Sequence, residues 1–275
     1  MKILLFGGSG MVGRELAKAF AHHSVIAPTH AQVDIGDATM VERVVVQEKP
    51  DFTINAAAII DVGALERDPA LGVRINVQGA ENIARAATAR AVPHILISSS
   101  YVFGTSSQPY SEDAAKNPQN AYGKTKAGAE DALLACDSSA PRYIVRSSWL
   151  YSHYRDTFVD EVAQTLLQGK PFDASAQRGN PTHCGEFAEA VVKKFVGSSP
   201  PSGVYHIVNE GGTSRFEIAC EVARTLGMPE DLVVAKEFPS SAMRPSVVLT
   251  NTKLPKLATW QESLRAYITT RYMQK

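Results

Sequence analysis

Tyr122 and Lys126 stand four residues apart in the stretch NAYGKTKAGAE, residues 120–130. In a helix this spacing places two side chains on the same face, one turn apart. A phenol with an ordinary pKa near ~10 is poorly matched to acid–base work at neutral pH unless its anion is stabilised. An ammonium group within ~4–6 Å favours the phenolate, so Lys126 is expected to lower the pKa of Tyr122. Such a pair is suited to proton transfer, but it also arises by chance in helices, so its meaning depends on the rest of the chain.

A serine upstream provides a third polar group for the same chemistry. The stretch ISSSYVFG, residues 97–104, follows an apolar run at 94–99 and carries Ser99 and Ser100. Ligands of parallel sheets bind at the carboxyl ends of the strands. The sequence therefore places these hydroxyls at the edge of the sheet where a ligand is expected to bind.

The glycine-rich stretch GGSGMVG provides Gly7, Gly10 and Gly13, followed into the first turn by Met11 and Val12. It lies between an apolar run at 2–7 and a helical pattern at 11–23. Such a loop needs a residue that tolerates positive φ, and its backbone must approach a pyrophosphate without a Cβ in the way. The following helix presents free N–H groups to the phosphates. This context predicts dinucleotide binding.

The segment VIAPTHAQVDIGD decides between NAD and NADP in folds of this kind. It has no acidic residue directly after the strand and no arginine, so the choice stays open with a slight lean to NADP or dual use. Asp34 and Ile35 are expected to border the adenine. Asp34 or Asp37 could instead be a helix N-cap. The small residues of INAAAII, residues 54–60, allow close approach of a cofactor.

Short apolar runs at 2–7, 24–27, 52–55, 94–99 and 142–148 alternate with helical patterns near 11–23, 38–48, 70–91 and 121–136. This alternation predicts an α/β fold with a doubly wound parallel sheet. After residue 150 the rhythm is less regular, with helices near 156–168, 184–196 and 214–226 and one strand at 203–208. We expect a dinucleotide-binding domain at 1–150 and a smaller substrate lobe at 151–275, partly interleaved with the sheet.

The composition narrows the functional class. The chain has 275 residues, with 28 Lys plus Arg against 28 Asp plus Glu, so no overall positive field favours nucleic acid. No apolar run reaches the ~20 residues of a membrane span, and no secretory leader is recognisable. Three scattered cysteines indicate reduced thiols. The histidines show no metal-ligand spacing. A cytoplasmic enzyme without a protein metal site is expected.

The order of glycine loop, strand-end serine and Tyr-x-x-x-Lys resembles the extended short-chain dehydrogenase/reductase family. The stretches NAAA, PYSED, RSSWLYS, QRGNPT, GVYHIVNEGGTSRFEIA and RPSVVLTNTKL narrow the likeness to the dTDP-4-dehydrorhamnose reductase family, over nearly the whole chain. The resemblance implies reduction of the 4-keto group of a nucleotide sugar by NADPH or NADH, with dTDP-4-dehydro-L-rhamnose as substrate. It also implies a homodimer by analogy and, in some members, a need for Mg²⁺.

Residue roles follow from the same resemblance. Catalysis is assigned to Ser99, Tyr122 as general acid and Lys126, which would also hold the nicotinamide ribose. Sugar contacts are assigned to Ser99, Ser100, Tyr122 and Trp149. The cofactor-binding set is Gly7, Gly10, Met11, Val12, Gly13, Asp34, Ile35, Asn55, Ala57, Ala58, Ile59, Ile97, Tyr122 and Lys126.

Several positions depart from the family pattern around the substrate. Ser100 replaces an aspartate, Ile59 and Ile60 replace polar residues, and HYRDTF replaces a glycine-rich segment. Two alternatives therefore stand beside the reductase. One is a nucleotide-sugar epimerase or dehydratase with tightly bound NAD. The other is a non-catalytic NADP-binding subunit like the regulatory subunit of methionine adenosyltransferase.

Overall fold

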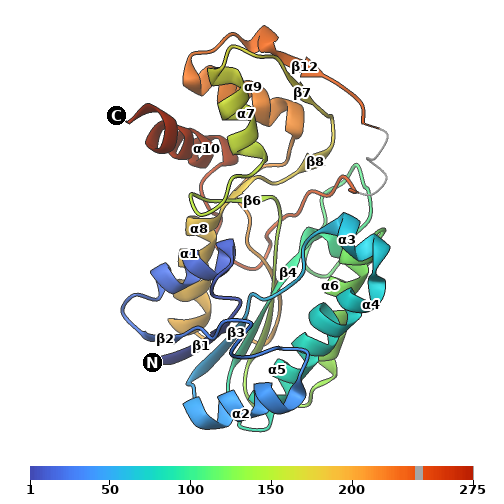
Figure 1. Cartoon of the computed structure of the whole chain (residues 1–275), viewed down its shortest axis with the longest axis vertical. Coiled ribbons are helices and arrows are strands. Elements are labelled where there is room, and N and C mark those ends of the chain that lie inside the picture. The colour runs from blue at the N-terminus through green and yellow to red at the C-terminus, as the bar shows by residue number, and fades with distance from the viewer. Residues whose placement is uncertain (239–243, 275) are drawn as a thin grey trace.

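The computed structural model of the protein describes residues 1–238 and 244–274, with six parallel strands in one central sheet (Figure 1). In spatial order these are β2 (Ser24–Ile26), β1 (Lys2–Phe6), β3 (Phe52–Asn55), β4 (His94–Ser99), β5 (Arg142–Ser147) and β10 (Gly203–His206). Every pairing is parallel. The chain winds outward in both directions from β1 and β3, which confirms the predicted doubly wound α/β fold.

Helices cover both faces of the sheet (Figure 1). On one face lie α1 (Met11–Ala19) and α8 (Cys184–Val191), the latter continued by a π-helical turn, η3 (Val192–Val196). On the other lie α2 (Ala38–Glu48), α5 (Gly79–Thr88) and α6 (Ala121–Ala135). Ile3 and Leu5 pack toward the first layer, whereas Leu4 and Phe6 pack toward the second. This burial of alternate residues on both faces explains why the strand reads as an unbroken apolar run.

The helical pattern predicted at 70–91 does not form one regular helix. The segment consists of α4 (Pro69–Gly72), a π-helical stretch, η1 (Val73–Gln78), and α5. Asn76 in the π-helical stretch donates to Ile59 O and to Thr125 Oγ1 at 2.9 and 3.0 Å, and it accepts from Ile59 N at 2.8 Å. A widened helical turn that aims one side chain at a neighbouring loop is a known device near functional sites.

A second, smaller core lies in the C-terminal part of the chain (Figure 1). It is built by α7 (Phe158–Leu167), α9 (Arg215–Leu226) and α10 (Trp260–Ile268), with η6 (Thr269–Met273) after α10. Three short strand pairs lie in the same part of the described chain. They are β6 (Leu150–Tyr151) with β9 (Thr182–His183), β7 (Phe172–Ala174) with β12 (Val233–Ala235), and β8 (Arg178–Gly179) with β11 (Thr213–Ser214). Short 3-10 turns lie at η2 (Ser100–Val102) and η4 (Glu230–Leu232).

Two helices were not predicted, α3 (Val62–Arg67) and α10, because α3 is very short and α10 follows a turn-rich segment. The predicted strand at 203–208 forms β10, which adds to the edge of the main sheet beside β5. The division near residue 150 remains our proposal, with α8 and β10 as the later segments that join the first layer. Within the residues described, no helix is both long enough and apolar enough to cross a membrane.

Candidate active site

The glycine loop is folded as tightly as its sequence predicts. Gly7 has φ +82°, and a Cβ there would lie 2.5 Å from Ala57 N. A Cβ at Gly13 would lie 2.1 Å from Gly7 O, so the first turn of α1 is pressed onto the loop. Gly10 is the N-cap of α1 and contributes no side-chain cap. Met11 and Val12 open the helix, whose first N–H groups are available to an anion.

The loop after β3 lies beside the glycine loop, and buried asparagine side chains hold its backbone in place. Asn55 is almost fully buried, and its Oδ1 accepts from Ala57 N at 3.0 Å. Asn76 holds the backbone of Ile59 by the two hydrogen bonds described above. Ala57 and Ala58 are partly exposed next to Gly7. The small residues therefore border the glycine loop, as expected of a wall against which a cofactor lies.

The two residues expected to border the adenine, Asp34 and Ile35, lie in different surroundings. Asp34 pairs with Arg74 at 2.9 Å and accepts from Gly36 N at 2.9 Å. The hydrogen bond from Arg74 is the main reason that the pKa of Asp34 is lowered. Ile35 is buried, and the N-cap of α2 is Asp37. The alternative of Asp34 as the helix cap is thereby removed.

Tyr122 and Lys126 both reach the end of β4 from α6. Asn120 caps this helix and accepts from Gly123 N at 2.7 Å. Lys126 is 3 % exposed, and its Nζ donates to Ile97 O at 2.7 Å. Tyr122 hydrogen-bonds with the Ser99 side chain. The two residues predicted to share a helix face therefore bind positions 97 and 99 of the same strand.

Burial shifts the pKa values of Tyr122 and Lys126 in directions that were not expected from the sequence. It raises the pKa of Tyr122 to about 12, and the hydrogen bond from Ser99 offsets this only in part. Burial lowers the pKa of Lys126 to about 8, opposed by the carboxylate of Glu130. The expectation of a lowered Tyr122 pKa is thus wrong, because desolvation of the phenolate dominates. Tyr122 stays a phenol at neutral pH, which is the form that can donate a proton.

A buried ion pair lies directly behind this group. Glu130, one turn beyond Lys126, accepts from Arg146 Nε and Nη2 at 2.8 and 2.7 Å. It also accepts from Ser98 Oγ at 2.5 Å, and Lys116 Nζ approaches it at 3.6 Å. Both members of the pair are at most 3 % exposed. Sequence reasoning missed Glu130 and Arg146 because a glutamate on a helix and an arginine in a strand ordinarily read as solvent-facing residues.

The two serines at the end of β4 differ in their surroundings. Ser99 is partly exposed, and its Oγ accepts from Tyr101 N at 3.2 Å. Ser100 is 1 % exposed, and its hydroxyl donates to Ser148 Oγ at 3.3 Å. The expected contact of Ser100 with the sugar is therefore corrected to a buried structural bond, because the 3-10 turn that begins at this residue turns it inward.

Trp149, directly after β5, has a strained backbone with φ +40°. A left-handed conformation is uncommon for a bulky residue. The indole packs against Gly179, where a Cβ would lie 2.5 Å from the ring. Its ring centroid lies 4.6 Å from Arg215 Cζ. The structure thus adds Arg215 next to the residue predicted to pack against the sugar.

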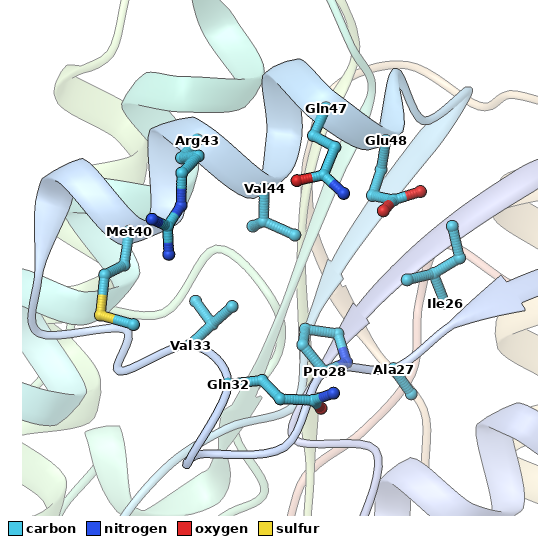
Figure 2. A pocket seen from close by; sticks show the side chains of 10 residues that line it. All are labelled: Ile26, Ala27, Pro28, Gln32, Val33, Met40, Arg43, Val44, Gln47 and Glu48. Atoms are coloured by element: carbon cyan, nitrogen blue, oxygen red, sulfur yellow. The ribbon is translucent and has the colours of Figure 1, made fainter.

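A separate pocket of about 260 Å³ opens between α2 and the segment after β2 (Figure 2). None of the catalytic candidates lines it. Arg43 and Glu48 are its charged residues, and Figure 2 shows the Arg43 side chain descending from α2 into it. The lining residues are Ile26, Ala27, Pro28, Gln32, Val33, Met40, Arg43, Val44, Gln47 and Glu48.

Among residues 1–238 and 244–274, no three His, Cys, Asp or Glu side chains are grouped as a cation site requires. Magnesium therefore remains an expectation that rests on the resemblance alone.

Several known proteins are similar to this chain over most of its length. Curated relatives include the spore coat polysaccharide biosynthesis protein SpsK of Bacillus subtilis, 31 % identical over 97 % of this chain and 96 % of that protein. A dTDP-4-dehydrorhamnose reductase of Mycolicibacterium smegmatis is 33 % identical over 96 % of this chain and 84 % of that protein. A solved dTDP-4-dehydrorhamnose reductase of Clostridium acetobutylicum is 32 % identical with a TM-score of 0.90, covering 98 % of this chain and 99 % of that one.

A dTDP-4-dehydrorhamnose reductase of Bacillus anthracis, solved in complex with NADP, has a TM-score of 0.90 at 25 % identity, covering 98 % of this chain and 99 % of that one. The family model described as "RmlD substrate binding domain" matches residues 1–273. The glycine loop, whose tight backbone leaves no room for a Cβ at Gly7 or Gly13, precedes a helix N-terminus, an arrangement suited to the phosphates of a nicotinamide cofactor. The chain is a member of the RmlD family, whose relatives include the dTDP-4-dehydrorhamnose reductases.

Proposed function

We propose that this protein reduces the 4-keto group of a nucleotide sugar, dTDP-4-dehydro-L-rhamnose in the first place, with NADPH or NADH. The observation that carries the proposal is the meeting of Ser99, Tyr122 and Lys126 at the end of β4, at the same carboxyl edge of the sheet as the glycine loop that follows β1. The names of relatives that match over nearly the whole chain support the same reaction.

Each residue has a distinct part in the reaction. When bound, the reduced nicotinamide supplies the hydride that converts the ketone to an alkoxide. Tyr122, protonated at neutral pH because burial raises its pKa to about 12, donates its proton to that oxygen. Ser99 hydrogen-bonds the same oxygen and orients it. Lys126 places a positive charge behind the phenol and is available to the nicotinamide ribose.

The test is consumption of NADPH absorbance by the purified protein with the 4-keto sugar. Tyr122→Phe should reduce the rate by ~10²–10⁴-fold, the usual contribution of a general acid, while NADPH binding persists. The exposed Tyr154 gives the matched control, Tyr154→Phe, which should keep full activity. A flat trace with several 4-keto nucleotide sugars would overturn the proposal. NAD that copurifies with such an inactive protein would indicate the epimerase or dehydratase instead.

Cofactor choice, assembly and location are finer parts of the proposal. A lean to NADPH is supported by the lack of an acidic residue directly after β2 and by the cationic Arg43 in the pocket beside Pro28. Comparing kcat/KM for NADPH and NADH tests it. A homodimer and a cytoplasmic location are proposed by analogy, and sedimentation analysis with and without Mg²⁺ would test both the dimer and the role of the ion.

A further inference from the structure

A short helix joins the wall of the cofactor site to the start of α6. This helix, α3, follows directly after the loop at 57–60 that borders the glycine loop, and it lies beside α6 (Figure 1). Leu65 of α3 is fully buried. Gly72 lies between α3 and α6, because a Cβ there would be 2.8 Å from the Leu65 side chain and 3.0 Å from the Thr125 methyl group. The short helix is therefore packed closely against α6.

Glu66, next to Leu65, reaches the first turn of α6. Its Oε1 accepts from Ala121 N at 2.7 Å. Ala121 is the first residue of α6, so its N–H has no carbonyl partner within the helix. The cap residue Asn120 accepts from Gly123 N at 2.7 Å. Two N–H groups at this helix start are thus bound by side chains, one from α6 itself and one from α3. The Glu66 carboxylate also interacts favourably with the positive end of the helix dipole.

The position of this turn decides where the proton donor lies. Tyr122 follows Ala121 directly, and its side chain hydrogen-bonds with Ser99 at the end of β4. Gly123 lies close to the segment after β4, since a Cβ there would be 2.1 Å from Tyr101 O. The first turn of α6 is therefore held against that segment, and the bond to α3 fixes it relative to the wall of the cofactor site.

We propose that Glu66 is a positioning residue for the proton transfer, which keeps Tyr122 within reach of the substrate oxygen by fixing the start of α6. The assignment rests on the proposed function for the identity of the reaction. Glu66 acts through the backbone N–H of Ala121 and not on the reacting atoms. A displaced acid loses rate, because proton transfer requires hydrogen-bond distance to the substrate oxygen. Since the loop at 57–60 leads directly into α3, the same bond fixes the acid relative to the cofactor.

The test compares two variants that remove this bond from its two ends. Glu66→Ala removes the acceptor, and Ala121→Pro removes the donor. Proline is well accepted at the first position of a helix when the preceding residue is extended, as Asn120 is here with φ −137° and ψ 167°. Each variant should lower kcat for the keto sugar by about 3- to 10-fold, the usual effect of losing one hydrogen bond, with little change in NADPH affinity. The double variant should lose no more than either one, since both changes break the same bond.

Isotope effects distinguish positioning from a purely structural role. A displaced acid slows the proton step, so the solvent deuterium isotope effect on single-turnover reduction should rise in Glu66→Ala and in Ala121→Pro. Glu66→Gln keeps an acceptor oxygen and should restore most of the rate together with the wild-type isotope effect. The matched control is Glu81→Ala, which removes a carboxylate that pairs with Arg85 on the surface of α5. It should equal the wild type in rate and isotope effect.

Hydrogen exchange gives a reading that does not depend on the reaction. The amides of residues 120–126 should exchange faster in Glu66→Ala than in the wild type, whether or not the protein reduces a keto sugar. Unchanged exchange in this segment would overturn the proposal. Faster exchange with an unchanged kcat and isotope effect would also overturn it, because the bond would then be structural only. Faster exchange in a protein that reduces no keto sugar would support the link from α3 to α6 and sink the proposed reaction alone.

Discussion

Tyr122 keeps its proton because the surrounding protein disfavours the phenolate, whereas Lys126 loses its proton more readily than a free lysine. Burial moves the two pKa values apart, to about 12 and about 8. Such displacement of neighbouring groups is typical of catalytic sites. The two residues therefore have different roles: Tyr122 holds the proton that is donated, and Lys126 carries a positive charge that depends on pH.

This division predicts an alkaline limit to the reduction. Lys126 is an ammonium below its pKa, so kcat/KM for the keto sugar should fall as the pH rises through about 8. Tyr122 remains protonated over the same range. Initial rates between pH 6 and 10 measure the effect, since kcat/KM reports ionisations of the free enzyme. Lys126→Met should be strongly impaired at every pH, whereas Lys124→Met, exposed on the same helix, should retain the wild-type profile. A wild-type profile that stays flat beyond pH 9 would contradict the assignment.

Among the secondary-structure elements, α6 and β4 are joined by three side chains of the helix. Tyr122, Lys126 and Glu130 lie at successive turns of α6, and they bind Ser99, Ile97 O and Ser98 of β4. Arg146 on β5 then fixes Glu130 by two hydrogen bonds. The ion pair thereby sets the register between the helix and the strand end that carries the serine. It also provides the negative charge that opposes the loss of the Lys126 proton.

Glu130→Gln should therefore affect both stability and pH dependence. It leaves Arg146 buried with no full counter-charge, which should lower the free energy of unfolding by ~3–5 kcal/mol. Without the Glu130 charge the pKa of Lys126 falls further, so the alkaline limit of kcat/KM should move to lower pH. Urea unfolding and the rate profile measure the two effects. Asp131→Asn, one residue away at a 67 % exposed side chain, is the control and should change stability by ~0–1 kcal/mol. An unmoved alkaline limit in Glu130→Gln would show that the ion pair is structural only.

Over the whole molecule, the two cores are connected by polar groups as well as by packing. Asn180, 1 % exposed between β8 and β9, donates to Gly211 O and Leu249 O at 3.1 and 3.2 Å and accepts from Leu249 N at 2.8 Å. Ser152 after β6 donates to Glu15 of α1 at 2.6 Å. The Ser152 bond ties the substrate lobe to a helix of the main sheet, whereas the Asn180 bonds hold segments of the lobe itself together.

Asn180→Ala should consequently weaken both stability and catalysis. Two buried backbone groups of Leu249 and the carbonyl of Gly211 lose their partner, so the free energy of unfolding should fall by ~2–4 kcal/mol. Loosening of these segments within the substrate lobe should also raise KM for the sugar nucleotide, while NADPH affinity changes little because the glycine loop is distant in sequence and independently packed. Thermal unfolding and steady-state kinetics measure these effects. Gln168→Ala, exposed directly after α7, is the control. An NADPH affinity that fell as much as sugar affinity would argue against this separation.

The sequence alone determined the parts of the fold that local chemistry controls. Five apolar runs and four helical patterns in the first half were enough to predict the doubly wound sheet, and the glycine spacing predicted the tight turn with positive φ at Gly7. The candidate acid and its lysine were also visible, because a helix converts a four-residue spacing into a shared face. The predicted roles of these residues remain to be tested by the variants above.

Only the tertiary structure decided the surroundings of those residues. The Glu130–Arg146 pair, the Asn76 clamp on Ile59 and the enclosure of Arg215 join residues that are 16, 17 and at least 57 positions apart. No local pattern encodes such contacts, because each depends on which strands and helices become neighbours. Burial, which reversed the expected direction of the Tyr122 pKa and turned Ser100 inward, is likewise a property of the assembled fold. The spacing in the sequence identified the candidate residues, and tertiary packing determined their protonation states and the directions of their side chains.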